Sequence, residues 1–482
     1  MAGRSPFLAH RILWVASVLL AAACEQSDAR LFPTQRLNEV PGSVAPGFLP
    51  DYTALSARSS GVAVAWMAAS GAAPREIVMR ISADSGRTWG EEFRPGSSAF
   101  RGADATDPQL VRFPGNEALL LLQDVLSGSG RAKSVAIQAS LDEGRTFLPP
   151  QTLNQASRVF DPVALALPDR NGLVVWVRQM DRSRQLMFRA SADSGRTWGE
   201  PAKRLDVSGT GLARQPNLLA LPDQQVLAVW EQRASTNRGG RSRPHLRIAV
   251  GSNHGRKWSD SRPVDTRFEG PSPLWPQLAL ASGRISLVWS TAVTGATHRG
   301  AVVLSQSLDG GRSWSTPQEL FVGEEAPKTN LQASGEHVYL SWHGGPRADI
   351  GIYFLASEDG GNNWREGRTE PQRIDDPQAE GNALRPAMAA DGEGRVAIVW
   401  TTGGKEVWMR YSIDHGGSWS DLLPLAAEEG RGRLKYPQIA ISSGQALVTW
   451  ERWPDKALHV QSIADVEKRL PLDLFFRRIE LS

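Results

Sequence analysis

One eight-residue pattern recurs along the chain and constrains its fold more than any other feature. The segment Ser82–Trp89 has the sequence SADSGRTW, and Ser191–Trp198 repeats it letter for letter. Related versions occupy Ser140–Phe147, Gly251–Trp258, Ser307–Trp314, Ser357–Trp364 and Ser412–Trp419. The last aromatic residues of the copies are 89, 147, 198, 258, 314, 364 and 419, so the gaps run from 50 to 60 residues. A period of this length indicates an architecture of repeated structural units.

Two further signals recur between these copies. Most intervals contain an apolar run that ends in Trp, such as Val62–Trp66 and Leu447–Trp450. Six runs are preceded by an X-Pro pair, namely Asp107-Pro108, Asp161-Pro162, Gln215-Pro216, Trp275-Pro276, Arg385-Pro386 and Tyr436-Pro437. Short segments rich in β-branched and aromatic residues predict strands. Each unit therefore predicts four antiparallel strands, with the X-Pro pair before the first and the octapeptide between the third and fourth.

Four-stranded units repeated in this way predict an all-β protein with the fold of a β-propeller. Seven octapeptides and eight apolar runs favour eight blades, with seven or six as alternatives. Residues 32–37 resemble residues 200–205, which follow the third octapeptide, so we expect them to close the ring as an outer strand. A rival closure uses the C-terminal tail, where Leu470, Leu472, Leu474 and Phe476 alternate with other residues.

The N-terminal residues predict an export signal. Arg4 and Arg11 are followed by an apolar run over residues 12–23, which is too short to span a membrane. Cys24 follows three alanines and resembles the acylated cysteine of bacterial lipoproteins, whereas an ordinary cleaved signal and an uncleaved anchor are the alternatives. We therefore expect a signal over 1–24, a tether with the closing strand over 25–47, a propeller over 48–463 and a tail over 464–482. The expected location is the bacterial cell envelope, with a lipid anchor as the only contact with the membrane.

Composition excludes several classes of function. The chain has 54 Lys and Arg against 51 Asp and Glu, a net charge of +3, so no basic field suggests a nucleic-acid partner. The eight histidines are scattered without metal-ligand spacing, and Cys24 is the only cysteine. We therefore expect no metal and no cofactor.

The octapeptide resembles the Asp box, or BNR repeat, of sialidases and related propellers, and the resemblance covers nearly the whole mature chain. In such a turn the carboxylate accepts backbone N–H groups, and the glycine adopts a positive φ without steric cost. Equivalent carboxylates spread around a ring cannot all serve one substrate. We therefore predict a structural role for Asp84, Asp142, Asp193, Asn253, Asp309, Asp359 and Asp414. The resemblance implies that these turns lie on the face away from the active site.

Candidate functional residues gather on the opposite face, which we call the mouth face. In an up-and-down blade it collects the residues just before the first strand and just after the apolar run, and such loops commonly carry binding sites. The candidates for catalysis are Asp107, Asp161, Tyr436, Glu451 and Glu231. The candidates for ligand binding are Arg178, Arg214, Arg233, Arg385, Arg452, Trp275 and His343. The alternative is a solvated rim with internal ion pairs.

The resemblance to sialidases implies a specific set of catalytic parts. Those enzymes hold the sugar carboxylate with three arginines and use a Tyr nucleophile, activated by a Glu, with an Asp as acid and base. The matching residue types are Arg178, Arg214 and Arg385, Tyr436 with Glu451 or Glu231, and Asp107 or Asp161.

The sequence departs from the sialidase pattern in two respects. No Phe-Arg-Ile-Pro-like motif precedes the first octapeptide, and sialidase propellers usually have six blades. Two hypotheses follow: a non-catalytic propeller that binds a glycan or an envelope protein, and an active exo-sialidase or other glycoside hydrolase. Convergence of three arginines beside Tyr436 and a Glu favours the enzyme, whereas arginines paired with neighbouring acids favour binding.

Overall fold

The computed structural model describes residues 29–45, 53–59, 61–69, 74–96, 103–115, 117–126, 133–154, 158–180, 183–206, 211–233, 244–264, 272–291, 300–364, 371–454 and 472–481. Every named helix or strand in these ranges is a β-strand, as expected for an all-β protein. Within the same ranges, no helix has the length and apolar character needed to span a bilayer. Residues 1–24, for which the sequence predicts an export signal, lie outside the described residues.

Most strands belong to antiparallel sheets whose members follow one another in sequence. One sheet contains β3 (Ala54–Arg58), β4 (Gly61–Ala68) and β5 (Glu76–Ser82). Four sheets have four strands each, and the first contains β6 (Asp104–Arg112), β7 (Leu119–Leu126), β8 (Lys133–Ser140) and β9 (Gln151–Thr152). The second contains β19 (Pro273–Ala281), β20 (Arg284–Thr291), β21 (Gly300–Ser307) and β22 (Gln318–Gly323), and the third contains β23 (Thr329–Ser334), β24 (His337–Gly344), β25 (Gly351–Ser357) and β26 (Gln372–Arg373). The fourth contains β27 (Ala383–Ala390), β28 (Val396–Thr402), β29 (Glu406–Ser412) and β30 (Leu423–Ala427).

A nine-stranded sheet contains two successive units of the same kind. Its strands are β10 (Val159–Ala166), β11 (Gly172–Gln179), β12 (Arg184–Ser191), β13 (Lys203–Arg204), β14 (Leu212–Ala220), β15 (Val226–Arg233), β16 (His245–Ser252), β17 (Lys257–Trp258) and β18 (Arg262–Pro263). The pairs within β10–β13 and within β14–β18 are antiparallel, and the two groups meet at one parallel pair, Arg184 with Leu212.

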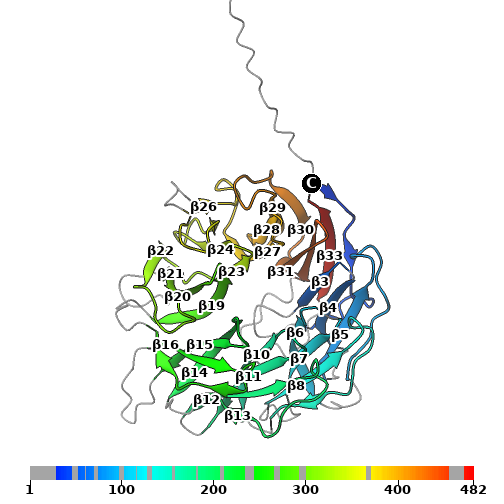
Figure 1. The fold of residues 1–482 in the computed structure, drawn as a ribbon. Coiled ribbons are helices and arrows are strands. Elements are labelled where there is room, and N and C mark those ends of the chain that lie inside the picture. Colours follow the sequence, from blue (N-terminus) through cyan, green and yellow to red (C-terminus); the bar gives the residue numbers. More distant parts are fainter. Residues whose placement is uncertain are drawn as a thin grey trace, which may run out of the picture.

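The sheets follow one another around a ring, as the blades of a propeller do (Figure 1). The first strand of each sheet contacts the first strand of the next, in the order β3, β6, β10, β14, β19, β23, β27 and β31 (Arg433–Ser442), and β31 contacts β3 again. These first strands lie on the inner side of the ring (Figure 1). The repeat in the sequence is therefore a repeat in space.

The two ends of the chain share one sheet. Its strands are β1 (Arg30–Leu31), β2 (Gln35–Arg36), β31, β32 (Gln445–Trp453) and β33 (Asp473–Glu480). Both β1 and β2 pair with β33, and β33 pairs with β32 along its length. The sequence predicts a tail over residues 464–482 and leaves the N-terminal strand and this tail as rival closures of the ring. The structure instead pairs the two segments with each other.

The segment that follows β2 is packed rather than a free tether. Leu37, Val44 and Ala45 are buried, and Val44 bridges to both Leu472 and Ala68. Val44 therefore links the sheet that holds the chain ends to the sheet of β3–β5. Leu37, Val44 and Ala45 of this stretch thus belong to the core, whereas Val40 is exposed.

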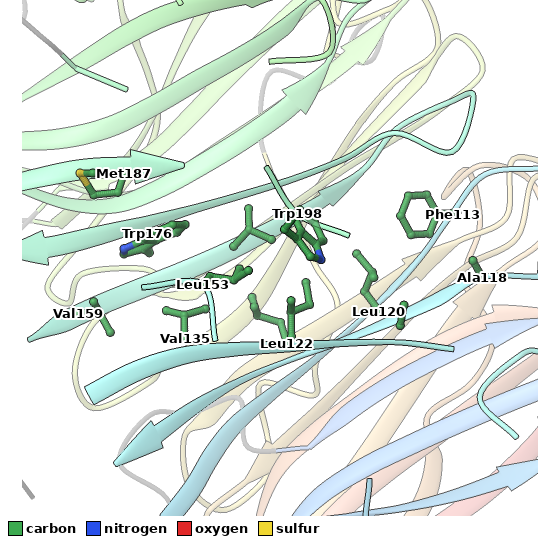
Figure 2. Close-up of a cluster of buried hydrophobic side chains, with 13 residues drawn as sticks. Phe113, Ala118, Leu120, Leu122, Val135, Leu153, Val159, Trp176, Met187 and Trp198 are labelled. Atoms are coloured by element: carbon green, nitrogen blue, oxygen red, sulfur yellow. The ribbon is translucent and has the colours of Figure 1, made fainter. Parts of the chain in front are cut away.

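The apolar runs form the core between sheets. Trp66, Trp176, Trp230, Trp342, Trp400 and Trp450, which end these runs, are all fully buried. Between the sheet of β6–β9 and the unit of β10–β13, Leu120 and Leu122 lie in one cluster with Trp176 and Trp198 (Figure 2). Burial of large aromatic side chains contributes strongly to stability, so each interface between sheets holds its own part of the core.

The octapeptide forms the hydrogen-bonded turn that the sequence predicts. In the first copy, Asp84 Oδ1 accepts from Ser82 Oγ at 2.8 Å and from Thr88 N at 2.9 Å, and Asp84 Oδ2 accepts from Thr88 Oγ1 at 2.7 Å. Burial raises the pKa of Asp84, but these bonds outweigh that effect and hold it at about 2. Equivalent bonds surround Asp142, Asp193, Asp309, Asp359 and Asp414.

Candidate functional site

The X-Pro pairs lie inside the first strand of their sheets, not before it as the sequence analysis expected. The register between first and second strands shifts at each pair; for example, Arg214 pairs with Glu231 and the next pair is Asn217 with Val229. The residue before proline has a φ between 49° and 58° at Asp107, Asp161, Gln215, Trp275, Arg385 and Tyr436. Proline fits such a bulge because it has no N–H to leave unpaired. The strand thus continues upstream of the pair. We call these six residues the bulge ring.

The bulge ring lies at the end of the sheets opposite the Asp boxes. In the unit of β10–β12, the residue opposite Arg178 is Val159, at the start of β10. Ser191 of the Asp box pairs with Gly172, at the other end of β11. The mouth-face positions and the octapeptides are thus separated by the length of the strands.

Members of the bulge ring contact one another between neighbouring sheets. Asp161 Oδ2 accepts the backbone N–H of Gln215 at 2.9 Å, and Gln215 Oε1 accepts the backbone N–H of Trp275 at 3.0 Å. The Arg385 guanidinium carbon lies 4.4 Å from the centre of the Tyr436 ring, a cation–π contact. Five of the predicted site residues, Asp107, Asp161, Trp275, Arg385 and Tyr436, occupy equivalent bulge positions on the first strands of their sheets.

A cluster of charged and aromatic side chains surrounds Glu451 and Tyr436. We call Arg385, Lys435, Tyr436, Glu451 and Trp453 the tyrosine cluster. Lys435 is paired with Glu451 across β31 and β32, and its Nζ lies 4.1 Å from the centre of the Trp453 ring. The rings of Tyr436 and Trp453 are 6.0 Å apart, edge to face. The cluster thus combines two cations, two aromatic rings and one carboxyl group.

The Glu451 carboxyl is 1% exposed and is held by two donors. Trp453 Nε1 donates to Oε2 at 2.8 Å, and Thr53 Oγ1 donates to Oε1 at 3.4 Å. Burial raises the pKa of Glu451 to about 7, against the opposing effect of these hydrogen bonds and of the charges of Lys435 and Arg385. A buried carboxyl with this pKa exchanges a proton near neutral pH, which suits a general acid.

His343 also belongs to this side of the mouth face. Burial, together with the positive charges of Lys328 and Arg385, lowers its pKa to about 4. The imidazole is therefore neutral at physiological pH, and its Nδ1 is buried. His343 adds a neutral polar group beside the charged side chains.

Glu231 is the centre of a second polar cluster. It is 1% exposed, lies opposite Arg214 in the register, and accepts from Arg233 Nε at 3.2 Å. Burial raises its pKa, against the nearby charges of Arg233 and Arg214. Tyr436 lies on another sheet, so the structure associates Tyr436 with Glu451 and not with Glu231.

The candidate arginines go to different partners. Arg178 donates to Gln185 Oε1 at 3.2 Å, Arg233 is paired with Glu231, and Arg452 forms an ion pair with Glu428. Arg385 contacts the ring of Tyr436. The ion pairs of Arg233 and Arg452 are of the kind that the alternative of a rim with internal ion pairs predicts.

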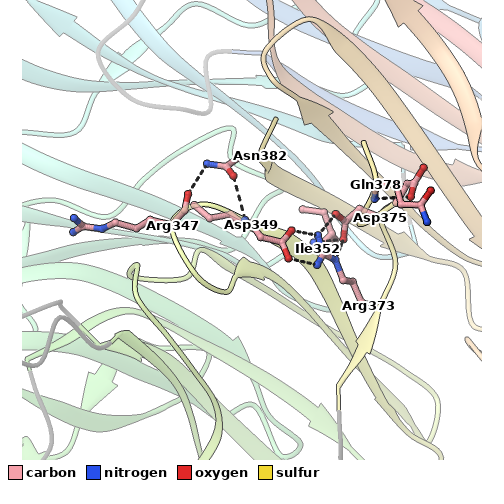
Figure 3. A network of polar contacts seen from close by, with 9 residues as sticks. Arg347, Asp349, Ile352, Arg373, Asp375, Gln378 and Asn382 are labelled. Carbon is pink, nitrogen blue, oxygen red and sulfur yellow. Dashed lines mark hydrogen bonds and ion pairs between the residues drawn. The ribbon is translucent and has the colours of Figure 1, made fainter. Parts of the chain in front are cut away.

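Sequence reasoning missed the residues that brace the loop after β24. Arg373 donates to both carboxylate oxygens of Asp349, at 2.9 and 2.7 Å, and to both oxygens of Asp375, at 3.0 Å each (Figure 3). Asp375 Oδ1 also accepts the N–H of Ile352 at 2.7 Å, and Asn382 joins the same loop through Arg347 and Ile350 (Figure 3). Spacing alone does not mark this network, because Asp375 is two positions from Arg373 whereas Asp349 lies on a different loop.

Two further residues of the site, Gln215 and Lys435, stand at positions that the sequence could have indicated. Gln215 stands at the X position of its X-Pro pair, but its charged neighbour Arg214 drew attention instead. Lys435 likewise precedes Tyr436 and was passed over. In the described ranges, no group of three or more His, Cys, Asp or Glu side chains is placed to hold a metal ion.

Comparison with known proteins places this architecture in a family. A family model described as a BNR repeat-like domain matches residues 61–339. The structure of an ulvan lyase, described as a new family of polysaccharide lyase, is similar with a TM-score of 0.52 and 11% identity, covering 80% of this chain and 96% of that one. Among curated proteins, none is similar enough to count as a match.

Two further solved structures are similar at lower scores. The Penicillium chrysogenum α-L-arabinanase complexed with arabinobiose is 16% identical with a TM-score of 0.42, covering 65% of this chain and 94% of that one. The phage phi92 endosialidase is 11% identical with a TM-score of 0.42, covering 93% and 69%. Since the family model matches more than half of the sequence, this chain belongs to the BNR repeat-like domain family.

Proposed function

We propose that the protein binds a carbohydrate on its mouth face, with the tyrosine cluster as the main contact. The observation that carries this proposal is the position of Arg385 over Tyr436, 4.4 Å from the ring centre, beside the buried Glu451. Aromatic rings pack against the C–H face of a sugar, and charged side chains hydrogen-bond its hydroxyl groups. The ulvan lyase of similar fold is named a polysaccharide lyase, so a glycan is a better first ligand to test than an envelope protein.

The test is a screen of the purified mature chain against an array of oligosaccharides, followed by titration of the best ligand. We expect Arg385→Ala to weaken binding by at least about tenfold, as is usual for a central arginine contact. The matched control is Arg312→Ala, because Arg312 lies on the Asp-box turn and bonds the Asp309 carbonyl. Unchanged affinity in Arg385→Ala, or equal losses in both variants, would refute the assignment of the site.

A second candidate function is hydrolysis of a glycosidic bond. It is favoured by Glu451, whose raised pKa of about 7 and position next to the Tyr436 strand suit proton transfer. The pairing of Arg233 and Arg452 with neighbouring acids argues against their use in a sialidase-like clamp and leaves other glycosides open. Turnover of a fluorogenic glycoside panel, abolished in Glu451→Gln and Tyr436→Phe, supports hydrolysis. Binding without turnover on any sugar leaves the first proposal.

We also infer the full extent of the ring and the location of the protein. Eight first strands in succession support eight blades, the last built from both chain ends by β31, β32, β33 and the N-terminal strands. The basic and apolar N-terminus followed by Cys24 supports export and a lipid anchor on that cysteine. Incorporation of labelled palmitate that is lost in Cys24→Ser tests the anchor. A water-soluble, unlabelled mature protein would contradict it.

A further inference from the structure

Three consecutive bulges are linked in a chain of hydrogen bonds that ends at Trp275. The register shifts leave Gln215 and Trp275 outside the pairs of their own sheets. A backbone N–H without a ladder partner needs another acceptor. The side chain of the preceding bulge residue provides it in both cases, from Asp161 to Gln215 at 2.9 Å and from Gln215 to Trp275 at 3.0 Å.

The chain of bonds has a direction and a defined end. Trp275 cannot continue it, because an indole donates but does not accept a hydrogen bond. The next first strand, β23, pairs with β24 without a shift in register, and Asn330 there pairs normally with Ser341. The bonds that run from Asp161 through Gln215 therefore hold one residue at their end, and that residue is an aromatic one.

Trp275 shares its backbone conformation with the other residues of the bulge ring, but its exposure is unusual. Its φ is 52°, a region that bulky residues rarely adopt, and its side chain is 39% exposed. Every other tryptophan in the described residues is buried or half-buried. A strained backbone that presents an aromatic ring to solvent is maintained only if the surroundings hold it, and such strain is concentrated at functional sites.

We propose that Trp275 is a stacking platform for a sugar ring, forming a second contact of the mouth face, and that Asp161 and Gln215 are positioning residues for it. This inference rests on the proposed carbohydrate function and extends it to a ligand of more than one sugar unit. The platform lies on β19, whereas the tyrosine cluster lies on β27, β31 and β32. A ligand class with an apolar pyranose face suits the flat indole.

The test separates positioning from binding. The protein is labelled with 5-fluorotryptophan, and the ¹⁹F resonance of residue 275 is assigned by its loss in Trp275→Phe. Gln215→Leu removes the acceptor, whereas Gln215→Glu keeps an acceptor oxygen at the same place. The matched control is Asn217→Leu, because Asn217 Oδ1 accepts the N–H of Leu278 at 3.2 Å between the same two strands.

We expect Gln215→Leu to shift the resonance of Trp275 and to weaken binding of the best oligosaccharide by about fivefold, as for the loss of one hydrogen bond. Gln215→Glu restores both, and Asn217→Leu leaves the resonance in place. Trp275→Ala weakens binding by at least about tenfold. The positioning role is overturned if Gln215→Leu leaves the resonance unmoved, or if Asn217→Leu moves it equally.

The outcomes for the platform and for the proposed function differ. If Trp275→Ala binds as the wild type does while Arg385→Ala does not, the platform is wrong and the carbohydrate site at the tyrosine cluster stands. If both variants bind as the wild type does, the assignment of the carbohydrate site to the tyrosine cluster fails as well. The ¹⁹F measurement needs no ligand, so it decides the positioning role in either case.

Discussion

His337 and His415 stack face to face, with ring centres 3.6 Å apart and planes 12° from parallel. His337 begins β24, and His415 lies in the Asp box after β29, so the pair joins two neighbouring sheets. The hydroxyl oxygen of the buried Tyr339 lies 2.7 Å from His415 Nδ1. Two imidazolium ions at this separation repel each other, so the contact requires at least one neutral ring.

This contact predicts that acid weakens the protein. Burial, together with the charge of His415, lowers the pKa of His337, with Glu336 and Glu358 acting in the opposite direction. A lowered histidine pKa means that the unfolded chain binds more protons, so the free energy of unfolding declines as the pH falls below 6.5, the ordinary value.

The measurement is urea denaturation at pH values from 8 to 5. The variant His337→Phe keeps a flat ring but cannot be charged, so we expect a weaker pH dependence than in the wild type. Burial, followed by the charges of Asp391 and Glu358, raises the pKa of Tyr339. Because Arg395 binds Asp391, Arg395→Gln checks whether that ion pair is the source of the dependence instead. Parallel curves for wild type and His337→Phe would contradict the prediction.

Glu451 is predicted to have the opposite pH dependence to His337: it lowers the free energy of unfolding as the pH rises, and Glu451→Gln removes this loss. A raised carboxyl pKa of about 7 means that the stability associated with Glu451 is fully present below 4.5 and is lost as the pH rises through 7. Glutamine keeps the acceptor for Trp453 and does not ionise. Between pH 5 and 9 the variant should therefore gain on the order of 2 kcal/mol relative to wild type in guanidinium denaturation. An equal difference at both pH values argues that Glu451 stays in one protonation state.

Loss of an Asp-box carboxylate should destabilise the fold without affecting the mouth face. Asp84→Ala removes the bonds from Ser82 and Thr88, which we expect to lower the free energy of unfolding by about 1 to 3 kcal/mol. In the fourth copy Arg256 N bonds the main-chain oxygens of Ser252 and Asn253, so Asn253→Ala should have a smaller effect. Differential scanning calorimetry measures both. A loss of ligand affinity in Asp84→Ala at unchanged stability would point to a functional role.

The Arg373 network is predicted to matter more than a surface ion pair. The Asp375 side chain is 5% exposed, so Arg373→Ala leaves a buried carboxylate without its main partner. We expect a loss of about 2 kcal/mol or more in denaturation. Arg395→Ala breaks pairs with Asp391 and the exposed Glu393 and should cost less than about 1 kcal/mol. Equal effects would show that the network does not brace the loop.

How far the sequence predicts each feature depends on the range of the interactions. The Asp box was predictable because its bonds join residues within four positions, as between Asp84 and Thr88. The propeller-like sheets were predictable from the regular spacing of the octapeptide copies along the chain. The pairing of β2 with β33 was not predictable in this form, because those strands lie at opposite ends of the chain and each alone looked able to close the ring.

The candidate site was only partly predictable for the same reason. The X-Pro positions identified Trp275, Arg385 and Tyr436, but placing them inside the first strand needs the register of two strands. The separate partners of Arg233 and Arg452, and the role of Gln215, depend on side-chain directions that spacing does not give. Alternation along β32 sends Glu451 and Arg452 to opposite faces of the sheet. This explains why Glu451 belongs to the tyrosine cluster and Arg452 does not.

The most direct test of a carbohydrate site is a crystal structure of the protein with the best oligosaccharide from the array. We predict electron density for the sugar in contact with Tyr436 and Arg385, on the face that carries the bulge ring. Density on the Asp-box turns, or none at the tyrosine cluster under saturating ligand, would contradict the account.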